Sequence, residues 1–359
     1  MKEVDVSVII PVYNAERYLK DTLDAIMKQT LESFEIIIIN DGSKDGTKEI
    51  IENFQKMYPG KIQYHFQDNQ GQSAARNNAL KYVRGKYIAF IDADDIVADW
   101  YLERMYLAAE QNGAEVVVCS YQKFVDETGE VLFNRYSNDW NVEFEPGYMH
   151  IFQYSPWARL CKTEFLKKYG FVFSVGEQLE DGPYCMMIEL LSSQTVVVNE
   201  VGYFYRVYNE STMGNIRKGE SVPKVPYKGV EAAIVKVKRN AHDTIILDML
   251  EFCSIKILTG FVTNMYKNCN KEARKKICRY CYYIISKYFP GFYNNPYIRI
   301  NRLQKLPLQH RIAVKLFVLM YRLRLLYFFS MLVSGGLRLQ EKVNLFVKRK
   351  CVRKSQNVK

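Results

Sequence analysis

The first ninety residues alternate between short apolar runs and amphipathic stretches, and this alternation constrains the fold more than any other feature. The pattern predicts strands over residues 6–10, 34–39, 61–66 and 86–91, with helices over 15–29, 45–57 and 73–83. The largely apolar run at 34–39 suits a strand that is buried on both faces. Strands and helices that alternate through short links predict an α/β fold with a mostly parallel, Rossmann-like sheet flanked by helices.

Polar residues follow each of the four predicted strands, over 11–14, 40–43, 68–71 and 92–95. In open α/β sheets, ligands bind at the carboxyl ends of the strands. Three of the four segments carry carboxylates, so these are expected to meet at one edge of the sheet. The sequence contains neither G-x-G-x-x-G nor G-x-x-x-x-G-K-[ST]. Dinucleotide-binding and P-loop proteins are therefore disfavoured.

The sharpest local signal is the segment Asp92-Ala93-Asp94-Asp95 at the end of the fourth strand. Two acids one residue apart offer the hard oxygen ligands that Mg²⁺ and Mn²⁺ prefer. A metal held there can neutralise a diphosphate leaving group. A solvated acidic turn is the alternative, because a lone D-x-D is common. The apolar strand over 87–91 that leads into the pair favours the functional interpretation.

Four segments in order, 6–14, 38–43, 71–77 and 90–95, resemble the motifs of family 2 glycosyltransferases with the GT-A fold, of the bacterial surface-polysaccharide kind. The resemblance implies that Pro11 and Tyr13 contact the nucleotide. It implies that Asp41 binds the base, usually uracil, although an Asx-turn at the Asp-Gly link is a second interpretation. The resemblance covers roughly residues 4–212.

The same resemblance implies roles for three charged residues around the donor. Arg76 is expected near the nucleotide-sugar phosphates, with an ordinary surface position on its helix as the alternative. Asp92 is expected to face the ribose or the sugar. Asp94 is expected to bind a divalent metal, Mn²⁺ or Mg²⁺.

Later segments match the family less closely. Trp157-Ala158-Arg159-Leu160 is similar to the W-x-K-L segment, with Arg in place of Lys, and Trp157 is expected either in the core or in the acceptor wall. Glu180-Asp181 matches the E-D pair, whose Asp is the expected catalytic base, with Gly182-Pro183 as an unusual continuation. The pair could instead cap the helix that follows. Arg206 and Ser211 match a trailing pattern that closes over the diphosphate.

Charge is divided unevenly along the chain. Residues 1–212 hold 20 basic and 32 acidic residues, whereas residues 213–359 hold 30 and 7, a net charge of −12 against +23. This asymmetry points to two parts with different partners. We expect a nucleotide-sugar-binding catalytic domain over 1–220 and a basic, mainly helical region over 221–359. The boundary falls between Met213 and Tyr227, where Gly and Pro accumulate.

The basic region predicts attachment to an anionic membrane surface. Lys and Arg interrupt the apolar stretch 312–333, and no apolar run there reaches the roughly 20 residues that a spanning helix needs. One helical side is expected to enter the lipid boundary, through Val314, Phe317, Val318, Tyr321, Leu325 and Phe328. The alternative is a helical subdomain that packs on the sheet or on a partner chain, including a homo-oligomer. Nucleic acid is disfavoured, because no binding motif is present and the amino-terminal half is acidic.

These features together predict an inverting, metal-dependent glycosyltransferase of the hexosyltransferase type. The donor would be a nucleotide-diphosphate sugar, most simply a UDP-sugar. The acceptor would be a glycan or a polyprenyl-diphosphate-linked glycan of a bacterial surface polysaccharide. Scattered cysteines and the acidic residues near Met1 favour a cytoplasmic location on the inner face of the membrane. A catalytically silent, membrane-bound scaffold of the same fold is the alternative.

Overall fold

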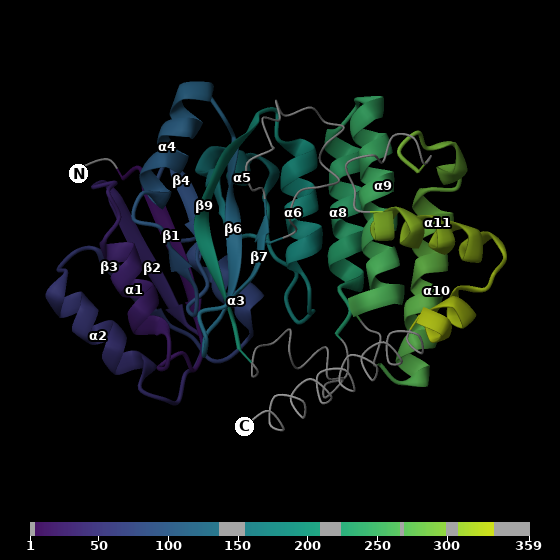
Figure 1. The fold of residues 1–359 in the computed structure, drawn as a ribbon. Coiled ribbons are helices and arrows are strands. Elements are labelled where there is room, and N and C mark those ends of the chain that lie inside the picture. Colours follow the sequence, from purple (N-terminus) through teal and green to yellow (C-terminus); the bar gives the residue numbers. More distant parts are fainter. Residues whose placement is uncertain (1–3, 136–154, 209–223, 266–268, 299–307, 334–359) are drawn as a thin grey trace, which may run out of the picture. The chain divides into compact units, whose positions relative to one another are not determined.

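The computed structural model describes residues 4–135, 155–208, 224–265, 269–298 and 308–333 (Figure 1). The chain divides into two compact units. The first comprises Met1–Asn209 and Lys224–Leu250, and the second comprises Glu210–Pro223 and Glu251–Lys359. Lys224–Leu250 therefore groups with the first unit, whereas the sequence analysis placed a boundary between residues 220 and 221.

The first unit is built on a sheet in which the described residues contribute nine strands, in the order β3-β2-β1-β4-β8-β6-β9-β5, with β7 paired to β6. Its first half is parallel, as predicted. This half consists of β1 (Val6–Val12), β2 (Phe34–Asn40), β3 (Ile62–Phe66) and β4 (Tyr87–Phe90). All residues of β1 and β2 are buried, which confirms that the sheet is covered on both faces.

The second half of the sheet is mixed. Strand β8 (Arg159–Lys162) runs antiparallel to both β4 and β6 (Val116–Val125). Strand β9 (Thr195–Val207) is parallel to β6, while β5 (Ile96–Val97) and β7 (Val131–Arg135) add antiparallel pairs. The predicted α/β class is confirmed, and the antiparallel strands appear where the sequence lost its regular alternation.

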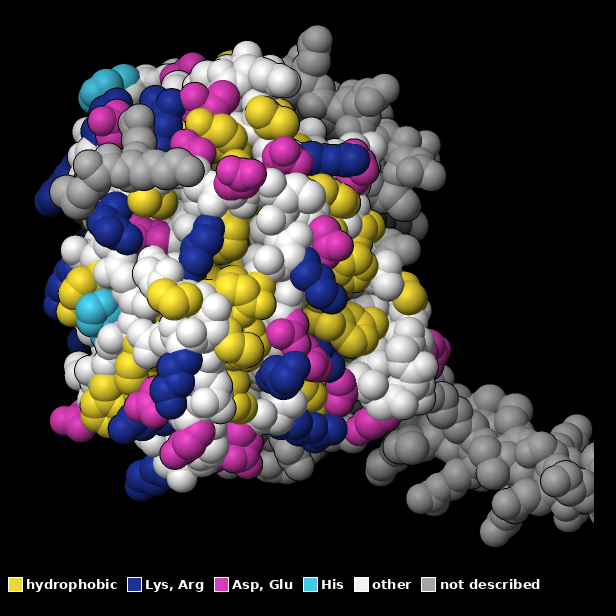
Figure 2. All heavy atoms as spheres, turned by 90° about the vertical axis from the view of Figure 1, so that its left-hand side faces the viewer, with side chains coloured by type: hydrophobic (Ala, Val, Ile, Leu, Met, Phe, Trp, Pro, Cys, Tyr) yellow, Lys and Arg dark blue, Asp and Glu magenta, His cyan; other side chains and the backbone are white. Residues whose placement is uncertain are grey.

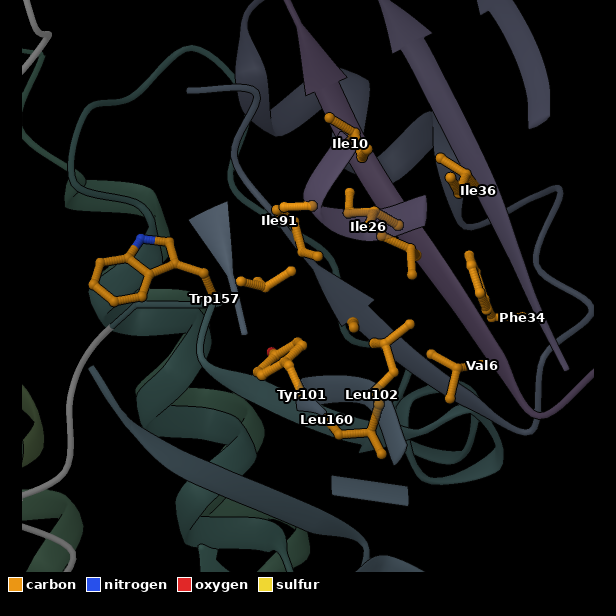
Figure 3. Close-up of a cluster of buried hydrophobic side chains, with 14 of the residues drawn as sticks. Val6, Ile10, Ile26, Phe34, Ile36, Ile91, Tyr101, Leu102, Trp157 and Leu160 are labelled. Carbon is orange, nitrogen blue, oxygen red and sulfur yellow. The ribbon is translucent and has the colours of Figure 1, made fainter. Parts of the chain in front are cut away.

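Helices α1 (Leu19–Met27), α2 (Thr47–Met57) and α4 (Tyr101–Asn112) contribute to one large apolar core with the even-numbered residues of β1. Figure 3 shows Val6 and Ile10 of β1 in this core, together with Ile26 of α1 and Leu102 of α4. Helix α3 (Gln72–Ala79) packs on β1 and β2. Further helices of this unit are α5 (Thr163–Tyr169), α6 (Asp181–Leu191) and α8 (Tyr227–Asn240).

The second unit is helical in its described part. Helix α9 (Thr244–Gly260) begins in the first unit and continues here, and a π-helical turn, Phe261–Met265, follows it. Then come α10 (Lys271–Tyr288), a 3₁₀ turn at Phe292–Asn294, α11 (Leu308–Arg322) and a last helical segment at 326–333. Within the described ranges, every helix is too short or too polar to cross a bilayer.

The lipid-facing side predicted for residues 312–333 is wrong in part. Val314, Phe317 and Tyr321 are buried, with 2%, 0% and 8% of their surfaces exposed. Tyr321 packs against Tyr282 of α10 and Phe292 of the 3₁₀ turn, with ring centroids 5.0 Å and 5.3 Å away. These three side chains form the buried face of α11, and Tyr321 packs there against its own unit. Leu325 and Phe328 are exposed, as expected.

Candidate active site

The carboxyl ends of β1, β2 and β4 lie next to one another, because β1 pairs with both of the other strands. Pro11 is buried in β1, and Tyr13 directly after the strand is 51% exposed. The Asn14 amide N–H donates to Ser43 Oγ over 2.9 Å, which ties the loop after β1 to the loop after β2. The predicted nucleotide-contacting residues therefore share one edge of the sheet.

Asp41 organises the loop between β3 and α3. Its carboxylate is 3% exposed and accepts hydrogen bonds from Gln67 Nε2 at 2.7 Å and from the backbone N–H groups of Gln70 and Gly71 at 2.9 and 2.7 Å. Gly71 has a φ of +90°, which favours glycine. A carboxylate has about four lone-pair sites, so three bonds leave one for a base. The base-binding role of Asp41 stays a prediction.

Arg76 joins three acidic residues from distant parts of the chain. Its side chain is 0% exposed, which excludes the surface-helix alternative. Nη2 donates to Asp92 Oδ1 at 2.8 Å, and Nη1 donates to Asp181 Oδ1 at 2.8 Å. Nη1 also lies 3.8 Å from Glu180 Oε1. The fold thus connects the D-x-D segment to the predicted catalytic base through one guanidinium, across 105 residues of sequence.

This cluster has more negative than positive charge. Burial raises the pKa of Asp181 from 3.8 to about 7, Arg76 opposes the rise, and Glu180 and Asp92 add to it. One guanidinium cannot balance three carboxylates, so one of them gains a proton readily. Asp181 is also the first residue of α6, where the helix N-terminus favours a carboxylate. Glu180 stands at the N-cap of α6 but makes no side-chain capping hydrogen bond, so the contacts do not favour the capping alternative. The role of Asp181 as the base stays a prediction.

Asp94 and Asp95 are held by β9 and the residue that follows it. Tyr208 donates its hydroxyl to Asp94 Oδ2 at 2.7 Å. Tyr203 donates to Asp95 Oδ2 at 2.7 Å, and its oxygen accepts the Asp92 N–H at 3.1 Å. Burial and the neighbouring Asp92 raise the pKa of Asp94 to about 6. The sequence analysis missed both tyrosines, although they lie three residues before and two residues after Arg206, which it singled out.

Residues 7–168 match the family described as glycosyl transferase family 2. This part of the chain is therefore similar to family 2 glycosyltransferases. GlyA of Streptococcus pneumoniae, a glycosyltransferase, is 34% identical over 214 residues, which is 56% of this chain and 30% of GlyA. GgaB of Bacillus subtilis, a minor teichoic acid biosynthesis protein, is 32% identical over 217 residues, 58% of this chain and 23% of GgaB. The chain thus spans less than a third of the length of these two relatives.

Solved glycosyltransferase structures share the fold of this chain. TarS 1–349 of S. aureus in complex with UDP-GlcNAc has a TM-score of 0.67 at 17% identity, covering 94% of this chain and 92% of that one. The mannosyltransferase PcManGT of Pyrobaculum calidifontis, in complex with GDP-Man and Mn²⁺, has a TM-score of 0.53 at 14% identity, covering 94% and 87%. At such identities the likeness concerns the fold alone.

Arg206 of the first unit is buried beneath the D-x-D loop. Its backbone N–H donates to Asp95 Oδ1 at 2.9 Å, and its Nε donates to the Asp94 carbonyl at 2.8 Å. Its Nη1 pairs with Asp126 and its Nη2 lies 3.3 Å from Asp21 Oδ2. These contacts favour support of the loop over the predicted contact with the diphosphate, which stays a prediction. Ser211 lies outside the described residues.

Trp157 belongs to the hydrophobic core of this unit. Its side chain is 6% exposed and stacks between Tyr203 and Tyr205, with centroids 4.7 and 5.2 Å away. Figure 3 shows it at the end of the core cluster. Arg159, which replaces the family's Lys, is equally buried and pairs with Glu189 at 2.9 Å. The contacts favour the core interpretation of Trp157 over the acceptor wall.

The donor set at the D-x-D fits a divalent cation held mainly by its substrate. In the described part of the chain, no three His, Cys, Asp or Glu side chains are grouped as a self-contained metal site. Mg²⁺ and Mn²⁺ bound with nucleotides need only one or two protein carboxylates, because phosphates and water complete the shell. Asp94, with Asp92 two residues away, supplies such oxygens, although Tyr208 shares Asp94 Oδ2.

Proposed function

We propose that the protein is an inverting, metal-dependent glycosyltransferase that moves a sugar from a UDP-sugar to a hydroxyl of a glycan or lipid-linked acceptor. The proposed setting is bacterial surface-polysaccharide synthesis. The family, the resemblance to GgaB and the fold shared with UDP-GlcNAc-bound TarS support it. The observation that carries the proposal is the contact of Arg76 with both Asp92 and Asp181. It links a donor-side acid to an acid suited to act as a base.

Asp181 is suited to general base catalysis at neutral pH. A base works best when its pKa lies near the working pH, and the pKa of Asp181 is raised to about 7. Its side chain is 28% exposed, so an acceptor hydroxyl can reach it. Arg76 holds Oδ1 at 2.8 Å. This fixes the orientation of the carboxylate while Oδ2 takes the proton from the acceptor.

Asp94, with Asp92, would hold the divalent cation. The cation supplies neutralisation of the charge that develops on the diphosphate leaving group. Arg206 and Tyr203 hold the backbone and side chains of residues 92–95 in place. The protein thus orients its metal-binding oxygens before the donor arrives, which lowers the cost of binding.

The test is donor binding and hydrolysis with UDP-, GDP- and dTDP-sugars in Mn²⁺, Mg²⁺ or EDTA. We expect a metal-dependent signal for UDP-sugars that Asp94→Ala abolishes. Asp181→Asn should bind donor normally and lose turnover by about a hundredfold or more, the range of a general base. Asp99→Asn, an exposed acid beyond the D-x-D loop, is the matched control. Full turnover in Asp181→Asn would refute its role as base. No nucleotide-sugar binding under any condition would favour the scaffold alternative.

A further inference from the structure

The outer face of α11 carries a row of exposed apolar side chains. Ile312, Leu316, Leu319 and Leu323 are 48%, 39%, 46% and 55% exposed. Ile312, Leu316 and Leu319 are spaced four and three residues apart, which places them on one side of α11, and Leu323 follows directly after the helix ends at Arg322. Four more exposed apolar residues follow within the next nine positions: Leu325, Phe328, Met331 and Leu332, at 43–55%. Leu323 and Leu325 lie in the link after α11, and Phe328, Met331 and Leu332 lie in the helical segment 326–333. We call these eight residues together the α11 outer face.

The α11 outer face is separate from the residues that stabilise the helix. Val314, Phe317 and Tyr321 form its inner, buried row, and Leu326 and Phe329 continue it with 0% and 5% exposure. The helix therefore buries one apolar side and still presents a second one. Single exposed leucines are ordinary, but a contiguous apolar row on a surface helix marks a binding surface.

The charge around this face selects an anionic partner. The chain has no Asp or Glu between Glu272 and Glu341, while this stretch holds 13 Lys and Arg. Arg311, Lys315 and Arg322 form a row beside the apolar one, at spacings of four and seven. By contrast, the face of the first unit seen in Figure 2 intermixes acidic, basic and apolar side chains. The partner must accept both leucines and cations along one helix.

We propose that the α11 outer face docks on an anionic lipid bilayer, with the leucine row in the acyl–headgroup boundary and the cation row at the lipid phosphates. An in-plane amphipathic helix has this combination of an apolar row and a basic flank. A second copy of the chain fits poorly, because two such faces would set cations against cations. Single-stranded RNA also fits poorly, since Phe328 is the one aromatic side chain among the eight and base stacking needs several.

The test is flotation of the full chain with vesicles of phosphatidylcholine alone or of equal parts phosphatidylcholine and phosphatidylglycerol. We expect binding to the anionic vesicles only, decreasing as salt is raised. Leu316→Gln/Leu319→Gln/Leu323→Gln should weaken it at least about tenfold, because each side chain loses its apolar burial. Arg311→Gln/Lys315→Gln/Arg322→Gln should weaken it about a hundredfold, at about fivefold for each cation near the surface.

The matched control is Met57→Gln/Leu107→Gln/Ile245→Gln, which changes side chains 59%, 44% and 45% exposed in the first unit and should bind like wild type. Three results would overturn the proposal: no flotation of wild type at low salt, equal flotation of the leucine variant, or RNA binding without vesicle binding. Wild-type dimers that the leucine variant abolishes, without flotation, would identify a second copy as the occupant. Flotation needs no donor or acceptor, so its failure leaves the proposed activity standing.

Discussion

Arg76→Gln removes the cation at the centre of the site and leaves Asp92, Glu180 and Asp181 facing one another. Both 2.8 Å bonds to the aspartates lose their charge. A neighbouring guanidinium lowers a carboxyl pKa by about 1 to 3. Without it, the pKa of Asp181 should climb further above about 7, because Arg76 is the group that opposes the rise. Loss of one partner of a buried pair should also cost about 3–5 kcal/mol of unfolding free energy.

The assay is metal-dependent donor hydrolysis measured across pH. A base must be ionised, so the rate should rise with pH around the pKa of Asp181. In Arg76→Gln the rise should move to higher pH, with a rate about tenfold or more below wild type at neutral pH and partial recovery in alkali. Arg76→Lys keeps the positive charge but offers it as a compact point charge, so the midpoint of its pH–rate curve should lie between those of wild type and Arg76→Gln.

Arg159→Gln is the matched control, because Arg159 is 2% exposed and pairs with Glu189 at 2.9 Å in the same unit. It should lower the unfolding free energy about as much, yet leave the midpoint of the pH–rate curve in place. If folded Arg76→Gln showed the wild-type midpoint, the coupling of Arg76 to the base would be refuted. An equal shift in Arg159→Gln would show that the shift reports general destabilisation.

Three further predictions concern the stability of the first unit. Glu35 is 2% exposed and accepts hydrogen bonds from Ser7 and Arg84; burial opposes its charge, but these bonds lower its pKa below 4.5. Glu35→Gln should therefore lower the free energy of unfolding by about 1–3 kcal/mol at pH 7, and by progressively less as pH falls through the folded pKa. Urea unfolding at several pH values measures this difference. Gly85→Ala would place a Cβ 2.4 Å from the Ser7 backbone nitrogen, so this variant should unfold at a much lower urea concentration than wild type. Gly291→Ala is the control: its Cβ meets nothing within 4 Å, and its unfolding midpoint should match wild type. Glu177 accepts hydrogen bonds from the backbone N–H groups of Lys228 and Gly229 in the first turn of α8, at 2.8 and 2.9 Å. Glu177→Gln should therefore lower the free energy of unfolding by about 1 kcal/mol, measured by thermal unfolding. An unchanged stability would show that water replaces this cap.

Local pattern was sufficient to predict the parallel half of the sheet. A strand such as β2 is recognisable from its run of consecutive apolar residues, which suits the burial of all seven residues in the structure. The polar residue that follows it, Asp41, must then lie at the carboxyl edge of the sheet. The antiparallel insertion of β8 between β4 and β6 was not predictable. Its four residues gain their strand character from pairing with chain segments far away in sequence.

The sequence by itself determined which side chains stand at the strand ends, because the periodicity of strands and helices is a local property of the chain. Only the tertiary structure decided what those side chains do to one another. From its own helix alone, Arg76 would be assigned as an exposed cation. The fold brings it next to Asp181, 105 residues away in sequence, and buries it there. Helix α11 is apolar on two sides, so its sequence periodicity alone could not identify which side is buried. In the structure Phe317 is buried and Leu319 is exposed. An amphipathic pattern defines the faces of a helix, and only its neighbours decide which face is covered.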